Sequence, residues 1–124
     1  MRGQGKIHGM NMLLVLTNLP DRASAEALAA VLVEDRLAAC VNILQPCRSV
    51  YRWQGAVEQA DEVPLLIKTS EARYAALENA IRVRHPYKTP EIIAVPVVLG
   101  LPDYLAWVMT ETRAETRTEH WPSP

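Results

Sequence analysis

The sequence predicts an α+β domain in which two helices cover one face of an antiparallel sheet. Three observations support this class. The chain has 124 residues, of which 49% are hydrophobic and 22% charged, so it is long enough to build one core and close to the globular average. Segments with the pattern of strands and of helices alternate along it. Its interior contains no linker long enough to mark a domain boundary.

The first strand and the first helix are predicted in the first third of the chain. Residues 12–16 form a continuous apolar run, which is typical of a strand buried on both faces. Pro20 follows this run, and Asp21 is a good N-cap because its side chain can accept a hydrogen bond from the first helical turn. Apolar residues then recur at helical spacing, so residues 22–36 are predicted to form a helix.

The next segment predicts a long, kinked hairpin. Residues 37–44 return to strand character, and residues 48–53 alternate polar and apolar side chains before a turn at 54–55. The return strand is predicted over residues 57–68. Pro64 lies within this strand and has no amide hydrogen to donate, so we expect a bulge or a locally unpaired stretch there.

A second helix, a fourth strand and a third helix complete the predicted fold. The second helix begins at Ser70 and ends at His85, because a residue before proline avoids the helical conformation. Residues 91–99 form the fourth strand, in which Pro96 fits an edge position. Apolar residues at i, i+3, i+4 and i+7 over 101–108 predict a short third helix near the carboxyl end.

The order strand, helix, strand, strand, helix, strand is that of a ferredoxin-like βαββαβ sandwich, which leaves one face of the sheet uncovered. The apolar side chains of that face, with Tyr51 and Trp53 on the hairpin, predict that copies of the chain associate into a closed homo-oligomer. We expect residues 11–112 to form the domain, residues 1–10 a flexible extension and residues 113–124 a loose tail.

Charge and cysteine content exclude several classes of function. Thirteen Lys and Arg residues against fourteen Asp and Glu residues give a net charge of −1, whereas binding to a duplex requires concentrated positive charge. Two cysteines are too few for a secreted disulfide framework. The apolar runs are too short to cross a bilayer, and the first ten residues lack the apolar centre of a secretory signal. We therefore expect a cytoplasmic protein that binds neither nucleic acid nor membrane.

Four segments, taken together, resemble the CutA family of divalent-cation tolerance proteins. They are RLAACVNI at 36–43, SVYRWQG at 49–55, LLIKT at 65–69, and HPY at 85–87 with PEI at 90–92. The resemblance implies a trimer of ferredoxin-like subunits, similar to the PII signalling proteins, with hairpins that reach onto neighbouring subunits. It also implies a role in tolerance of copper and other divalent cations. It brings no enzymatic activity, and we expect none.

The resemblance further implies a metal site formed by Cys40, His85 and Glu91. Thiolate, imidazole and carboxylate ligands suit copper or zinc better than magnesium or calcium. In the ferredoxin-like order, the strand near Cys40 and the strand that begins at Glu91 lie at opposite edges of the sheet. We therefore expect the three side chains to meet only across a subunit boundary.

Each of these three residues also has an alternative role. Cys40 lies in an apolar strand, where a free cysteine is often a small buried residue. His85 at a helix end also fits a helix cap, where the helix dipole favours a cation. Glu91 also fits a salt bridge with Lys68 or Arg84.

Other side chains are candidates for surface roles. The candidates for an interface or cleft are Tyr51, Trp53, Lys68 and Tyr87. The basic cluster of Arg82, Arg84 and Lys88 either stabilises a helix carboxyl end or binds a small anion, as a PII-like signalling or scaffold trimer would require. We expect Cys47 to be the more exposed of the two thiols and the one more open to oxidation.

Overall fold

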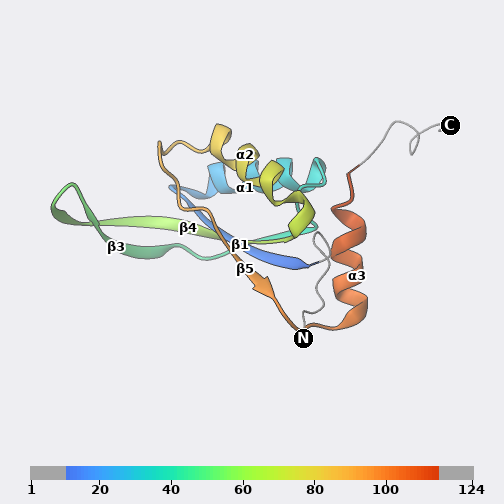
Figure 1. The fold of residues 1–124 in the computed structure, drawn as a ribbon. Helices are drawn as coiled ribbons and strands as arrows, with labels where there is room; N and C mark the ends of the chain where they lie inside the picture. The colour runs from blue at the N-terminus through green and yellow to red at the C-terminus, as the bar shows by residue number, and fades with distance from the viewer. Residues whose placement is uncertain (1–10, 115–124) are drawn as a thin grey trace.

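The computed structural model describes residues 11–114, which form a five-stranded antiparallel sheet and three helices (Figure 1). The strands are β1 (Met12–Leu19), β2 (Cys40–Ile43), β3 (Cys47–Trp53), β4 (Ala56–Ser70) and β5 (Ile93–Val97). The helices are α1 (Arg22–Glu34), α2 (Tyr74–Arg84) and α3 (Pro102–Glu111), with a 3-10 turn, Glu71–Arg73, before α2. The predicted extension at 1–10 and residues 115–124 of the predicted tail lie outside the described residues. Within them, no helix combines the length and the apolar character that a membrane crossing needs.

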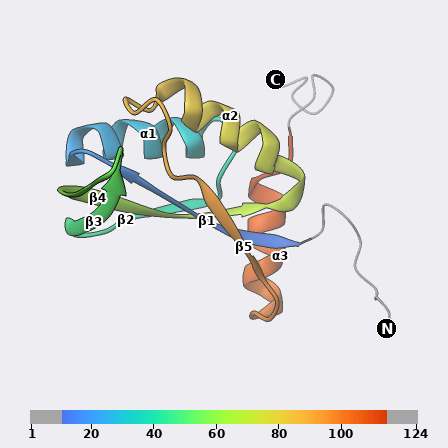
Figure 2. The same cartoon turned by 60° about the vertical axis from the view of Figure 1, so that its left-hand side comes forward.

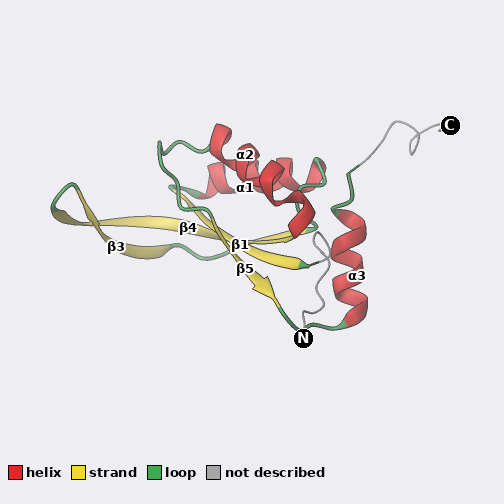
Figure 3. Ribbon diagram, in the orientation of Figure 1, coloured by secondary structure: helices red, strands yellow, loops and turns green. Residues whose placement is uncertain are grey.

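The strand order confirms the predicted ferredoxin-like arrangement. The sheet runs β2–β4–β1–β5, and β3 pairs with the other half of β4. The second predicted strand is therefore divided into β2 and β3. β5 pairs with β1 at one edge, which is the predicted position of Pro96, but it is shorter at both ends than the strand predicted over 91–99. Figures 2 and 3 show α1 and α2 together on one face of the sheet, with α3 at its end.

The helices form where the sequence predicts them, but their ends differ: α2 begins at Tyr74, after the 3-10 turn, rather than at Ser70, and α3 extends to Glu111. The carboxylate of Asp21 accepts a hydrogen bond from the Ser24 amide at 2.8 Å and so caps α1. This helix ends at Glu34 rather than at the predicted residue 36, because Arg36 adopts a positive φ of 58° that cannot continue a right-handed helix. α2 ends before His85, whose backbone is extended as the following proline requires.

The hydrophobic core lies between α1, α2 and the sheet face that they cover. Alternate residues of β1 and β4 point toward the helices, as the two-residue period of a strand dictates. The principal buried side chains of the core are Val15, Leu19, Leu28, Leu32, Val63, Leu65, Ile67, Leu77 and Ile81. The side chains between them on β1 and β4 face the opposite side of the sheet, which is open except at the end where α3 packs and where Met12 and Ser70 are buried.

The predicted interruption near Pro64 is present, but the extra residue lies in the facing strand. β4 is continuous, and Pro64 stays in register with Asn18 of β1. Residues 44–46, which separate β2 from β3, face only residues 63–64 of β4, so the bulge belongs to the first arm of the hairpin. The Pro64 carbonyl still accepts a hydrogen bond from the Leu44 amide at 2.9 Å. The missing amide hydrogen of the proline therefore coincides with a break in the ladder.

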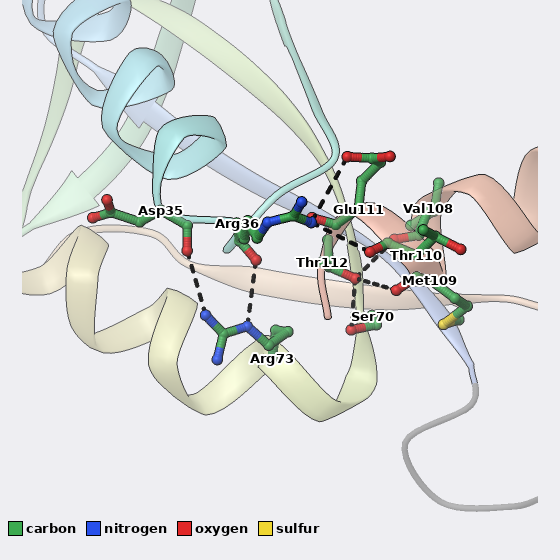
Figure 4. Close-up of polar contacts among 9 residues, drawn as sticks. All are labelled: Asp35, Arg36, Ser70, Arg73, Val108, Met109, Thr110, Glu111 and Thr112. Carbon is green, nitrogen blue, oxygen red and sulfur yellow. Dashed lines mark hydrogen bonds and ion pairs between the residues drawn. The ribbon is translucent and has the colours of Figure 1, made fainter. Parts of the chain in front are cut away.

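Two arginines hold the carboxyl ends of α1 and α3 against their neighbours (Figure 4). Arg73 donates to the backbone carbonyls of Asp35 and Arg36 at 3.4 and 3.3 Å. Arg36 in turn donates to the backbone carbonyl of Glu111 at 3.1 Å and lies 3.8 Å from its carboxylate. The last carbonyls of a helix have no partner within the helix, so these guanidinium groups satisfy them and join three elements.

Two buried threonines on the helix-facing side of the sheet provide a matched test of hydrogen bonding in the core. Thr69 donates to the Leu37 carbonyl at 2.7 Å, whereas the Thr17 hydroxyl has no hydrogen-bond partner among the described residues. An unpaired buried polar group costs about 1–3 kcal/mol. We therefore expect Thr17→Val to raise the free energy of unfolding by about 1 kcal/mol and Thr69→Val to lower it by a similar amount or more.

Urea denaturation of the two variants and the wild type, at one protein concentration, measures both effects. The two substitutions remove the same hydroxyl from equally buried positions, so each controls for the change in side-chain shape. Equal destabilisation by both would show that the Thr17 hydroxyl has a partner that stabilises the fold.

Candidate functional site

A cleft of about 660 Å³ opens between the hairpin and the loop that joins α2 to β5. Its walls include the aromatic side chains of Tyr51, Trp53 and Tyr87 and the carboxylates of Glu62 and Glu91. β3 supplies the first two aromatic residues, β4 supplies Glu62, and the loop supplies the other two. Three of the four residues predicted for an interface or cleft therefore line this cleft.

Glu62 is held in place by two hydroxyl groups. Ser49 donates to its Oε1 at 2.6 Å, and Tyr87 donates to its Oε2 at 3.2 Å. The pKa of Tyr87 is raised above its ordinary value, first by partial burial and then by the negative charge of Glu62. The phenol therefore keeps its proton and remains a donor to the carboxylate. Glu62 is not among the site residues predicted from the sequence, because its position opposite β3 depends on the register of the hairpin.

Asn18, at the end of β1, organises the other side of the cleft. Its side-chain amide donates to the Oε1 of Glu91 at 3.1 Å, and its backbone carbonyl contacts the Nε2 of His85 at 2.6 Å. The structure therefore brings together two of the three predicted metal ligands. Asn18 is also absent from the predicted site, and its one signal in the sequence is a polar residue shortly after the apolar run at 12–16.

His85 is buried, with 8% of its surface exposed, and both of its ring nitrogens have partners. The Tyr87 amide donates to Nδ1 at 3.1 Å, so this nitrogen acts as an acceptor. The ring hydrogen is thereby assigned to Nε2, which donates to the Asn18 carbonyl. These two bonds fix the start of the loop, and a metal ion would have to replace one of them.

Cys40 lies at the other edge of the sheet. It is half-buried on β2, where Lys68 Nζ is 3.8 Å and Asn42 Nδ2 is 3.9 Å from its sulfur. Lys68 pairs with Cys40 across β2 and β4 and also donates to the side-chain oxygen of Asn42. It does not line the cleft, unlike the other three residues predicted for an interface or cleft. β2 and β5 occupy opposite edges, as predicted, and the described residues contain no group of three His, Cys, Asp or Glu side chains placed to hold a metal ion. Cys47 is exposed, as predicted.

The predicted basic cluster is divided between different surroundings. Arg84 donates to the carbonyl of Ala80 in its own helix at 3.3 Å, which is the helix-end role that the sequence allowed. Arg82 is exposed on the same helical turn. Lys88 lines the cleft together with the two carboxylates. Among the described residues, Glu91 is hydrogen-bonded to Asn18 and forms no salt bridge with Lys68 or Arg84.

The strand order, the two helices on one face, the long hairpin and the third helix define a ferredoxin-like α+β subunit with a cleft at the base of its hairpin. A sequence model of the family described as CutA1 divalent ion tolerance protein matches residues 13–111. The chain therefore belongs to the CutA family.

The sequence of this chain aligns with those of similar proteins over nearly their whole length. The divalent-cation tolerance protein CutA of Thermus thermophilus is 42% identical over 99 residues, which cover 80% of this chain and 96% of that protein. The corresponding protein of Pectobacterium atrosepticum is 44% identical over 101 residues, which cover 82% of this chain and 92% of that protein.

Solved structures of the family superimpose closely on this chain. CutA from Xylella fastidiosa has a TM-score of 0.80 at 46% identity, with 82% of this chain and 98% of that chain covered. CutA1 from Oryza sativa has a TM-score of 0.82 at 36% identity, with 85% and 96% covered. These values confirm the predicted fold.

Proposed function

We propose that this protein is a cytoplasmic homotrimer that binds divalent cations, most strongly copper, in clefts between subunits and so contributes to metal tolerance without catalysing a reaction. Its relatives are named divalent-cation tolerance proteins, which supports the metal part of the proposal. The observation that carries the placement of the site between subunits is that Cys40 lies on the β2 edge of the sheet and Glu91 lies just before β5 at the opposite edge.

The open face supports self-association. Leu14 and Leu16 of β1 are paired with Val95 and Ile93 of β5, which are 47% and 53% exposed. Exposed apolar side chains at adjacent positions on a sheet mark an interaction surface. Copies arranged around a closed axis bury this face and bring the β2 edge of one subunit beside the β5 edge of the next.

The candidate ligands fit copper or zinc in such an assembly. Cys40 provides a soft thiolate from one subunit, and Glu91 provides a carboxylate from its neighbour. His85 completes the set if the metal replaces one of the two hydrogen bonds to its ring. Asn18 is hydrogen-bonded to both His85 and Glu91 and so holds these two candidate ligands near each other.

Isothermal titration with Cu(II) and Zn(II) tests the ligand assignment. We expect Cys40→Ser and His85→Ala each to weaken metal binding at least about tenfold, since each removes one ligand. Cys47→Ser is the matched control, because it removes the exposed thiol and leaves Cys40 in place. Zn(II), which has no redox chemistry, separates binding from oxidation of the thiols. Unchanged affinity in the Cys40 and His85 variants would refute the assignment.

The alternative, a PII-like signalling or scaffold trimer that binds a small anion or a partner protein, has less support. Arg84 is bonded to its own helix, and Lys88 lies beside two carboxylates. No contact among the described residues assembles the three basic side chains into an anion site.

A further inference from the structure

The cleft between the hairpin and the α2–β5 loop has a chemical character that metal binding does not use. Its walls combine three aromatic side chains with two carboxylates, and neither Cys40 nor His85 lines it. We propose that this cleft binds a small organic cation, a protonated amine or guanidinium group on an apolar stem. The inference shares Glu91 with the proposed metal site but can be tested separately, because Glu62 and the three aromatic rings are not proposed metal ligands and Cys40 does not line the cleft.

The aromatic wall suits the stem and the charge of such a ligand. Tyr51 and Trp53 are two residues apart on β3, so their side chains project from the same face of the strand. Both are exposed to solvent in the subunit. Tyr87 contributes a third ring from the loop. An aromatic face attracts a cation placed over it, and Trp gives the strongest such interaction.

The two carboxylates are positioned before any ligand arrives. Glu62 is fixed by the hydroxyl groups of Ser49 and Tyr87, and Glu91 is fixed by the Asn18 amide. Each carboxylate oxygen can accept more than one hydrogen bond, so both groups retain capacity for N–H donors of a ligand. Side chains that are already ordered lose little entropy on binding.

The charge of the cleft favours a cation over an anion. Lys88 is the one basic side chain among the residues that line it, against the two carboxylates. A bare metal ion is a poorer fit, because no three acidic, His or Cys side chains of the described chain converge there. The aromatic rings would contribute nothing to its coordination. A ligand with an amine or guanidinium group on an apolar stem can contact both the aromatic rings and the carboxylates of the cleft.

The size of the cleft indicates a small molecule. A volume of about 660 Å³ is within the usual range for small-molecule sites in proteins. The same chemistry also occurs on lysine and arginine side chains of other polypeptides. We assign the site to a free small molecule, and the experiment separates the two sources.

Titration calorimetry with agmatine, which carries a guanidinium and an amine on a four-carbon stem, tests this inference on the full-length protein after metal ions are removed with a chelating resin. We expect binding, and at least about tenfold weaker binding in Glu62→Gln and in Glu91→Gln, since each loses one charged hydrogen-bond partner. Glu58→Gln is the matched control. It removes the same charge from the same face of the same strand, because residues an even number of positions apart on a strand share a face. Glu58 lies four residues from Glu62 and does not line the cleft.

The remaining measurements decide between the possible occupants. 4-Guanidinobutanoate, in which a carboxylate replaces the amine, should bind more weakly than agmatine. Cys40→Ser should leave agmatine binding unchanged, although it should weaken metal binding, so failure of one proposal does not imply failure of the other. The inference is overturned if agmatine does not bind at millimolar concentration, if Glu58→Gln weakens binding as much as Glu62→Gln, or if an arginine-containing peptide binds and agmatine does not.

Discussion

Replacement of Val95 by glutamate should convert the proposed trimer into a folded monomer. Val95 lies on the open face of β5 and is 47% exposed in the subunit, so a carboxylate at this position stays in water while the chain is alone. Burial of an unpaired charge in an interface costs several kcal/mol, and three copies of the substitution would occur in each trimer. We therefore expect the association constant to fall by several orders of magnitude.

Sedimentation velocity and circular dichroism together measure this effect, the first for mass and the second for retention of the fold. Val83→Glu is the control, because Val83 is 66% exposed on α2, which lies on the covered side of the sheet. It should leave the trimer intact. A trimeric Val95→Glu protein would show that the open face does not form the interface.

Truncation of Ile67 to alanine should cause a large loss of stability in the subunit itself. Ile67 is fully buried on β4, paired with Val15 of β1 on one side and with Val41 of β2 on the other. Removal of a buried isoleucine side chain beyond its β-carbon costs about 2–5 kcal/mol, because transfer energy is lost and a cavity remains. We expect a correspondingly lower midpoint of urea unfolding.

Val57→Ala, on the same strand, is the matched control for this experiment. Val57 is exposed on the hairpin, so its truncation should change the free energy of unfolding of the subunit by less than about 0.5 kcal/mol. Monomeric Val95→Glu protein is the better background, because assembly does not contribute to its unfolding. Similar midpoints for both truncations would contradict the placement of the core.

The elements that local chemistry determines were predicted well. α2 ends where a residue precedes proline, and α1 begins at an aspartate cap. Two details depended on the rest of the fold. The positive φ of Arg36 shortens α1 by two residues, and nothing in the identity of an arginine predicts this conformation. Pro64 indicated a break in the hairpin, but only strand register shows that residues 44–46 contain the extra residue.

The candidate site was predictable only in part, because some of its residues are placed by strand order and others by contacts that depend on the rest of the fold. Strand order alone placed Cys40 and Glu91 at opposite edges. Glu62 and Asn18 could not be found in this way, because they enter the cleft through hairpin pairing and through contacts between segments far apart in the chain. The occupation of both nitrogens of His85 likewise depends on a backbone carbonyl 67 residues away.

The proposed function depends on whether other copies of the chain cover the open sheet face. Sedimentation equilibrium of the wild-type protein over a range of low micromolar concentrations measures this directly. We predict a mass three times the 13.8 kDa of the chain at every concentration. A mass of one chain, with the circular dichroism of a folded protein, would contradict it, because neither the interface nor the metal site between subunits would then exist.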